Sequence, residues 1–363
     1  MPMNARQARV VDPVLSNIAL GYASPAFTGR HLFPVISVPK RGGKVIKFDK
    51  SKHVDYSGAT RRAPGDSIAS TMYGYTSEPI ALYDDKLAGK VPKEWLEETE
   101  NIPSKAHGIR AVNNVMYQFE LQLEIQQATL AMNPASYDVK NKVTLAPGSQ
   151  FTDADVDPKV VFDAGKEAIR SKCGIDGNVV HFSPADWLAF CNNNVVREHF
   201  KYTSAESITE EMAKRYLQVD KVVVGKSVYA ASHDATEMSD IWSGGTVLAY
   251  VPQGEMAHID EPSFGYTYNR KGYPKVDQAW FDKGCDSWMY PTEVSRRPYL
   301  TSMQAGYLIQ ARANRAECSL FINRRSQSWP QQNRISCLHR SSIKAKCIVL
   351  ATCLSSMMRP LAN

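Results

Sequence analysis

The sequence predicts an α+β fold in which extended segments and one long helix accompany a region of alternating helices and strands. Three observations support this prediction. Apolar residues recur at three- and four-residue steps over 104–132, helix and strand signals alternate over 157–252, and residues 262–309 are rich in aromatic side chains interrupted by glycine and proline. With 363 residues, of which 43% are hydrophobic, the chain can form two domains or one elaborated domain.

The first element in the chain is a leading segment. Residues 10–38 combine short apolar groups with five residues that interrupt any regular element longer than a few residues, namely Pro13, Gly21, Pro25, Gly29 and Pro34. We therefore expect residues 1–40 to form an extended arm.

Two strands should follow the arm. Ile46 and Phe48 alternate with Lys47 and Asp49 over 44–50, and extended character returns over 72–83. About twenty mostly polar residues connect them, which is unusually long for a connection inside a compact domain. We expect a hairpin within 41–92 whose connection is either disordered or docked on another surface.

A long helix is the next element. Ser104 can cap its start, and Pro134 prevents its continuation. At 1.5 Å per residue this helix is about 40 Å long, so we expect a strut within residues 93–156. Its apolar positions are Ile109, Val112, Met116, Phe119, Leu123 and Leu130, with Gln126 as the one polar exception.

The alternating region begins with Asp157 as N-cap, Pro158 at the first helical position, and Cys173-Gly174 as a stop. A second helix follows Ser183 and Pro184, and a third fits 209–217. Strands are expected at 178–182, 221–224, 227–231 and 246–251. This order predicts an α/β domain over 157–260, followed by strands over 261–310 that return to pack beside the long helix.

Several strings, read together, resemble a family of tailed-phage major capsid proteins. None is diagnostic alone, and the resemblance depends on their joint order across nearly all of residues 10–310. The strings are Asp12-Pro13-Val14-Leu15-Ser16-Asn17-Ile18-Ala19-Leu20-Gly21-Tyr22, Leu32-Phe33-Pro34-Val35, Val247-Leu248-Ala249-Tyr250-Val251-Pro252, Glu261-Pro262-Ser263-Phe264-Gly265-Tyr266-Thr267, Gly272-Tyr273-Pro274 and Ala305-Gly306-Tyr307-Leu308-Ile309.

This resemblance implies the Hong Kong 97-like capsid fold. Its parts would be an N-terminal arm (1–40), an extended two-stranded loop (41–92), a spine helix with the first part of a peripheral domain (93–156), an α/β axial domain (157–260) and return strands of the peripheral domain (261–310). The arm and the hairpin have apolar faces that their own subunit is not expected to cover. We expect these faces to be buried against a neighbouring subunit.

The function implied is that of a structural subunit, and not an enzyme, which self-assembles through pentamers and hexamers into the icosahedral head around phage double-stranded DNA. Scaffold, portal or decoration proteins are the expected partners, with nonspecific contact to packaged DNA and no membrane. Arg6 and Arg9 precede no apolar run, and no stretch is long enough to cross a bilayer, so we expect assembly in the host bacterial cytoplasm and residence in the virion. An encapsulin-like compartment shell protein and a soluble α/β hydrolase using His233 or His181 are the alternatives.

Charge separates residues 311–363 from the rest of the chain. The formal net charge is +6, and this segment holds nine basic residues against the single acid Glu317, so residues 1–310 carry −2 and lack the basic footprint of a DNA reader. Four cysteines crowd the same segment, whereas Cys173, Cys191 and Cys285 are widely spaced and predict reduced thiols. We interpret 311–363 as an atypical basic, cysteine-rich tail from a shifted reading frame or a lost stop, with a genuine cationic tail that binds packaged DNA as the alternative.

Three motifs have both a chemical and a structural interpretation, and we favour the structural one for each. Gly225-Lys226-Ser227 would need a glycine at Asp220 to be a phosphate-binding loop, and Ser232-His233-Asp234 lacks a nucleophile elbow. The separations among Cys173, His181, Cys191 and His199 match no compact zinc pattern. We therefore expect no catalytic residue, cofactor or metal.

Charged residues near the hairpin are the candidates for subunit contacts. Arg61, Arg62, Lys86 and Lys90 either pair with acids of an adjacent subunit or keep an exposed hairpin soluble. The acidic pairs Asp84-Asp85 and Glu97-Glu98 lie next to Lys86 and Lys93, which predicts solvated or intersubunit ion pairs.

Overall fold

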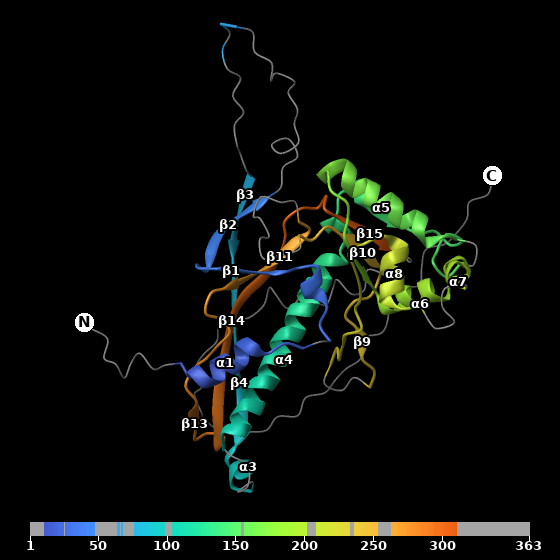
Figure 1. The fold of residues 1–363 in the computed structure, drawn as a ribbon. Helices are drawn as coiled ribbons and strands as arrows, with labels where there is room; N and C mark the ends of the chain where they lie inside the picture. The colour runs from blue at the N-terminus through green and yellow to red at the C-terminus, as the bar shows by residue number, and fades with distance from the viewer. Residues whose placement is uncertain are drawn as a thin grey trace, which may run out of the picture. The chain divides into compact units, whose positions relative to one another are not determined.

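Two β-sheets and one long helix organise the chain (Figure 1). The computed structural model describes residues 11–24, 26–47, 64–65, 67, 76–98, 104–153, 156–201, 208–232, 236–252 and 263–310. They belong to one compact unit, 1–314, whereas the second unit, 315–363, lies outside the described residues. The predicted basic tail therefore lies outside them as well.

The long helix α4 (Ser104–Ala131) has 28 residues, which confirms the prediction from apolar spacing. Val112 and Met116 lie in a core cluster on the six-stranded sheet, and Ala128 lies in a second cluster near the end of the helix. The helix thus contributes to two cores. Gln126 was the one polar residue at the predicted apolar positions of this helix. The polar residues that the structure buries are instead Glu124 and Gln127, which are 2% and 1% exposed.

The six-stranded sheet is built around a central strand, β14 (Ser287–Leu300). On one side β14 pairs antiparallel with all ten residues of β4 (Tyr83–Pro92). On the other side β14 pairs antiparallel with three shorter strands, β11 (Gly265–Arg270), β12 (Lys275–Val276) and β13 (Trp280–Asp282). The strand β1 (Val35–Val38) then pairs in parallel with β11, at the edge of the sheet.

Two glycines allow α4 to lie close against this sheet. A Cβ at Gly89 of β4 would be 2.9 Å from the Ala111 Cβ, and a Cβ at Gly108 of α4 would be 2.8 Å from the Tyr290 ring. Real side chains do not approach that closely, so the packing of helix on sheet requires both glycines.

The second sheet has five strands. Its outer pairs are parallel, whereas the central strand β10 is antiparallel to both neighbours. Every residue of the three inner strands is buried, which is typical of a sheet covered on both faces. The order is β5 (Lys142–Thr144), β15 (Gly306–Gln310), β10 (Thr246–Ala249), β6 (Val179–Phe182) and β7 (Lys221–Val224).

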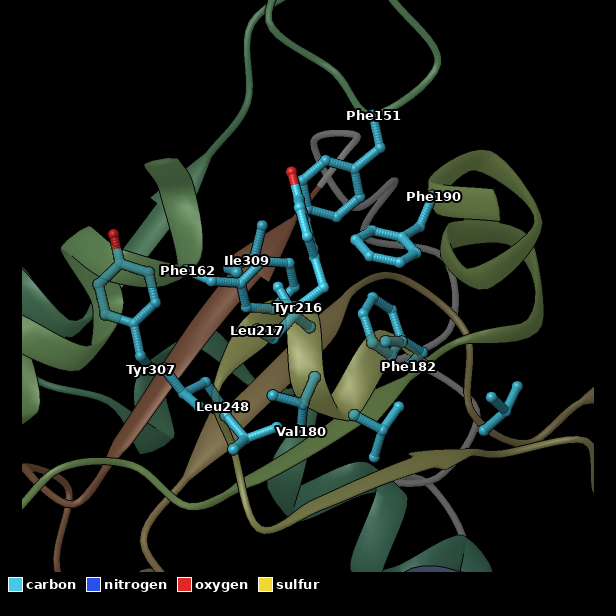
Figure 2. Close-up of a cluster of buried hydrophobic side chains, with 14 of the residues drawn as sticks. Phe151, Phe162, Val180, Phe182, Phe190, Tyr216, Leu217, Leu248, Tyr307 and Ile309 are labelled. Atoms are coloured by element: carbon cyan, nitrogen blue, oxygen red, sulfur yellow. The ribbon is translucent and has the colours of Figure 1, made fainter. Parts of the chain in front are cut away.

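Helices cover one face of this sheet, and their aromatic side chains form its core. Phe162, Phe190 and Leu217 come from three different helices and pack with the strand residues Val180 and Ile309 (Figure 2). The opposite face contributes to the cluster at the end of α4. The helices are α5 (Pro158–Cys173), α6 (Pro184–Asn192), α7 (Asn194–Phe200) and α8 (Glu210–Leu217).

The predicted start and stop signals of this region are confirmed. The Asp157 side chain accepts a hydrogen bond from the Lys159 N–H at 2.9 Å, and Gly174 ends α5 with φ of 76°. The Ser183 hydroxyl accepts from the Asp186 N–H at 3.2 Å, and Thr209 caps α8. These caps satisfy backbone donors that the first helical turn leaves open.

The leading segment is not the extended arm that the sequence predicted, because it begins with the helix α1 (Pro13–Gly21). The Asp12 carboxylate caps this helix by accepting from the N–H groups of Val14 at 2.9 Å and Leu15 at 3.1 Å. Pro13 was counted as a breaker, although proline at the first helical position favours a helix.

The same segment is buried by its own subunit, which corrects the expectation that only a neighbour would cover it. Leu15 and Ala19 are 8% and 1% exposed and join the cluster between α4 and the six-stranded sheet. After the short helix η1 (Gly29–His31), Leu32 and Phe33 are fully buried in the cluster at the end of α4. These four apolar side chains of the segment are therefore covered within one chain, whereas Val14 and Leu20 remain 62% and 55% exposed.

The predicted hairpin is present at its base. β2 (Gly42–Lys47) and β3 (Thr76–Ala81) pair antiparallel from Gly42 with Ala81 to Lys47 with Thr76. The connection between them lies outside the described residues except at 64–65 and 67. The segment directly after β3 is β4, which belongs to the six-stranded sheet.

The return segment divides between the two sheets. Residues 265–300 supply the strands beside α4, as expected, but β15 pairs with β10 and β5 and so completes the five-stranded sheet. The remaining elements are α3 (Lys93–Glu98), η2 (Pro134–Ser136), η3 (Val139–Asn141), β8 (Val228–Tyr229) and β9 (Ser239–Asp240).

Candidate functional site

A buried carboxylate, Glu124 on α4, holds the leading segment in place. Its Oε1 accepts from the Thr28 N–H at 2.9 Å and from the Trp242 Nε1–H at 2.6 Å, and its Oε2 accepts from the Gly29 N–H at 2.9 Å. The N–H groups at the start of η1 have no partner within that helix, so the carboxylate satisfies them. One side chain therefore joins α4, the leading segment and the loop before β10.

Gly29 lies so close to two side chains of α4 that a larger residue would displace them from the network. A Cβ at residue 29 would lie 2.1 Å from the Gln127 Oε1 and 2.8 Å from the Glu124 Oε2. Gln127 in turn donates from Nε2 to the Thr267 hydroxyl at 2.9 Å, and that hydroxyl donates to the Phe33 carbonyl at 3.2 Å. The hydrogen bonds thus continue into β11 of the six-stranded sheet.

His181 extends the same network into the five-stranded sheet. Its Nε2 lies 2.9 Å from the Thr28 Oγ1, and its ring lies 3.9 Å from the Trp242 ring. The Thr28 hydroxyl is also 3.2 Å from the Glu124 Oε1, to which it can donate. We therefore assign the proton of neutral His181 to Nε2, which leaves Nδ1 buried without a hydrogen-bond partner.

Burial keeps the two histidines near this network neutral. It lowers the pKa of His181 to about 3, and the nearby His31 adds to the effect. Burial, with the charges of Lys221 and Arg30, lowers the pKa of His31 to about 4. The Lys221 Nζ donates to the His31 Nδ1 at 2.9 Å, which requires that nitrogen to be unprotonated.

This network is built to fasten elements together. Its groups are a carboxylate, a neutral imidazole, an indole, an amide and hydroxyls, each joined to another part of the chain, and His181 is fully buried. The sequence did not single out Glu124, Gln127 or Trp242. Glu124 and Gln127 are polar residues three positions apart on the apolar side of the predicted helix. Buried polar groups need hydrogen-bond partners, so this spacing could have indicated a buried network.

The predicted interface residues fall in different places. Arg61 and Arg62 lie outside the described residues. Lys86 of β4 forms an ion pair with Asp277 in its own subunit, and Glu293 is 3.9 Å away. Lys90 of the same strand is exposed beside Met289 of β14. The structure therefore supplies Lys86 with an internal partner and leaves Lys90 at the surface.

One member of each acidic pair has a partner within the subunit. Asp84 lies 3.0 Å from the Arg41 guanidinium and accepts from the Ser295 hydroxyl. Glu97 lies 3.1 Å from Lys93, and both are exposed.

The residues weighed for zinc are dispersed. Cys173 lies in the helix-covered core, and Cys191 is partly buried on α6, where burial raises the pKa of its thiol to about 11. Cys173, Cys191 and Cys285 are not joined in disulfides. Within the described parts of the chain, no three His, Cys, Asp or Glu side chains are grouped so that they could hold a metal ion.

Gly225 belongs to a turn that packs on the network. A Cβ there would lie 2.5 Å from the Trp242 ring, and the Lys226 N–H donates to the Val224 carbonyl at 3.1 Å. His233 and Asp234 of the other motif lie outside the described residues, whereas Ser232 is exposed. Among the helices that the structure describes, none is long and apolar enough to cross a membrane.

Comparison with solved structures places this fold in a class. It is similar to the crystal structure of a phage-related protein from Bordetella bronchiseptica RB50, with a TM-score of 0.72 and 34% sequence identity over 84% of this chain and 98% of that chain. No protein-family model matches the sequence. The fold is therefore that of a phage-related protein.

Sequence comparison identifies the family. Over 305 residues, which are 83% of this chain and 96% of the relative, the sequence is 34% identical to the major capsid protein of Burkholderia phage BcepMu. The chain belongs to the family of phage major capsid proteins. It is a structural subunit of a capsid shell and a component of the virion.

Proposed function

We propose that this chain forms an icosahedral head around double-stranded DNA and has the Hong Kong 97-like arrangement. In that arrangement α4 is the spine, the six-stranded sheet belongs to the peripheral domain, the five-stranded sheet to the axial domain, and β2 and β3 form the base of the extended loop. The observation that carries the proposal is that α4 packs along β14 and β4 and also enters the core of the second sheet. A helix shared by two sheets suits a subunit that transmits force across a shell.

A structural role without catalysis, cofactor or metal is part of this proposal. His181, one of the two residues considered for a hydrolase, is 0% exposed and held between Thr28 and Trp242. A general base must reach the proton that it removes, and no substrate reaches this imidazole without unfolding its surroundings. The second, His233, lies outside the described residues.

Assembly is proposed to proceed through pentamers and hexamers in the host bacterial cytoplasm, with scaffold, portal or decoration proteins as partners. Arg61, Arg62 and Lys90 remain candidates for intersubunit ion pairs, whereas Lys86 would first have to leave Asp277. Contact with packaged DNA is proposed to be nonspecific, because residues 1–310 carry a net charge of −2.

The tail 311–363 is proposed to be dispensable for the shell. The sequence match covers 96% of the relative but only 83% of this chain, so the relative forms its capsid with a shorter polypeptide. This favours a tail of unselected composition over a segment that every subunit requires.

Expression of the full chain, followed by sedimentation and negative-stain electron microscopy, tests the proposal. We expect closed particles of uniform diameter that contain the chain as their main component. Small discrete oligomers, above all with measurable hydrolase turnover, would contradict it. Particles that enclose a cargo enzyme in place of DNA would indicate the encapsulin-like alternative.

A further inference from the structure

An apolar hollow lies at the base of the hairpin. It has a volume of about 230 Å³, and its lining includes Val45, Ile80 and Leu82, which are 2%, 8% and 3% exposed. Because Gly43 pairs with Ile80 across the hairpin, both point to the same face, as do Val45 and Leu82. Tyr268 of β11 also lines the hollow.

The rim of this hollow is basic. Lys40, Arg41 and Lys44 line it, and all three are exposed. The Arg41 guanidinium lies 3.0 Å from Asp84, but 62% of the Arg41 side chain remains exposed. An apolar hollow surrounded by cations fits an aromatic side chain flanked by carboxylates.

A complementary surface, an exposed tryptophan beside acidic side chains, is found on α3, the short helix that follows β4. Trp95 is 57% exposed there, and Glu94, Glu97 and Glu98 are exposed beside it. Helical spacing puts the three glutamates on one side of α3, with Trp95 at its edge. Glu97 forms an ion pair with Lys93 at 3.1 Å, so we expect Glu94 and Glu98 to be the acids that meet the cations of a partner surface.

Trp95 cannot enter the hollow of its own subunit. The hollow includes Leu82, directly before β4, whereas Trp95 follows its last residue, Pro92. β4 is paired with β14 over its whole length, and ten strand residues span about 33 Å. Figure 1 shows β2 and β3 near one end of β4 and α3 near the other. Any contact between the two features therefore joins two copies of the chain.

We propose that the hollow at the hairpin base binds Trp95 of a second copy of this chain, with Glu94 and Glu98 of that copy facing Lys40 and Lys44. The inference rests on the proposed shell function. A cavity of about 150 Å³ holds benzene, so about 230 Å³ is enough for an indole ring. Because each copy has the tryptophan at one end of β4 and the hollow at the other, the contact is heterologous and can continue from subunit to subunit.

Two variants test the two sides of the contact. Trp95→Ala removes the inserted side chain, and Gly43→Leu fills the hollow of its own subunit, where an added Cβ meets nothing within 4 Å. Each should lower the assembled fraction of the full chain by about tenfold or more, as truncation of a central interface residue does. The matched controls are Trp280→Ala, at a tryptophan that is 49% exposed, and Gly21→Leu, at a glycine that also has open space around it. Both controls should assemble as the unaltered chain does.

A mixing experiment separates failure of this contact from failure of the shell proposal. The Trp95→Ala chain still has the hollow, and the Gly43→Leu chain still has Trp95, so a mixture can form this contact once per pair. We expect a heterodimer by sedimentation in the mixture and none in either chain alone, whether or not the unaltered chain forms particles. A mixture that stays monomeric overturns the contact, and an unaltered chain that forms no particles overturns the shell proposal.

Charge reversal tests the role of the rim. Lys40→Glu with Lys44→Glu, or Glu94→Lys with Glu98→Lys, should each reduce assembly, and the four changes together should restore it. Restoration would show that these groups face one another, because a merely structural defect is not repaired by a second reversal. Normal assembly of both single-sided reversals would overturn the proposed pairing.

Discussion

The leading segment and the hairpin base are attached to the same subunit in different ways. Residues 11–38 bury Leu32 and Phe33 completely and receive the Glu124 carboxylate at Thr28 and Gly29. The hairpin base buries Val45, Ile80 and Leu82 but leaves a hollow of about 230 Å³ open to the outside.

This difference separates stability from assembly. A segment completed by its own chain contributes to the free energy of folding, whereas an open hollow contributes only when another surface fills it. Changes that remove the buried contacts of the leading segment should therefore destabilise the subunit. Changes at the hollow or at Trp95 should leave the subunit folded but unassembled.

The largest effect is expected from Glu124→Ala. The change leaves the N–H groups of Thr28 and Gly29 and the Trp242 indole N–H buried without their acceptor. We expect the free energy of unfolding to fall by about 3–5 kcal/mol, as measured by urea denaturation of the unassembled subunit. Glu167→Ala, at an exposed glutamate of α5, is the control and should leave the unfolding midpoint unchanged. Equal effects of the two changes would mean that the network does not hold the leading segment.

A smaller effect is expected from Leu15→Ala in α1. Leu15 packs with Val112 and Met116 of α4, and its loss leaves a cavity at that contact. The cost should be about 2–3 kcal/mol, near the lower end for buried leucines because Leu15 keeps 8% of its surface exposed. Val14→Ala, next to it but 62% exposed, is the control. If Leu15→Ala cost no more than Val14→Ala, α1 would not be part of the subunit core in solution.

The smallest effect at neutral pH is expected from His181→Gln, which keeps an N–H donor for Thr28 but cannot titrate. The folded-state pKa of His181 is lowered from 6.5 to about 3, so below pH 6.5 the unfolded chain takes up a proton that the folded chain does not. Stability from this group is therefore complete above pH 6.5 and is lost as the pH falls toward 3, at about 1.4 kcal/mol per pH unit.

Urea denaturation at pH 7 and pH 4.5 measures this difference. The variant should lose less stability than the unaltered chain between the two pH values. His31 acts in the same direction because its pKa is also lowered, so His31→Gln is the companion variant. It should change the pH dependence of the free energy of unfolding less than His181→Gln does. Identical pH dependence in the His181→Gln and unaltered chains would contradict the burial of a neutral imidazole.

Local signals in the sequence were sufficient for many elements. Asp157 with Pro158, Ser183 with Pro184, and Gly174 mark helix ends by hydrogen bonds and backbone angles within a few residues, so their outcome does not depend on the rest of the fold. The apolar spacing of α4 was similarly clear. The error at α1 came from counting Pro13 as a breaker when Asp12 and Pro13 form the same start signal.

The candidate site could not be predicted in this way. Glu124, Thr28, His181 and Trp242 are distant in sequence and meet only because α4, the leading segment and β6 converge. Similarly, the sequence indicated return strands after residue 260 but could not show that β15 joins a different sheet from β14. Strand partners are set by contacts between segments far apart in the chain.

By itself, the sequence determined the long helix, the caps of the α/β region and, through the order of its strings, the family. Those features depend on neighbouring residues or on matched patterns. Tertiary structure alone decided which apolar segments are covered by their own chain, because burial depends on whether a complementary surface lies within reach. For Leu32 and Phe33 that surface is the end of α4, whereas no described part of the chain fills the hollow beside Gly43.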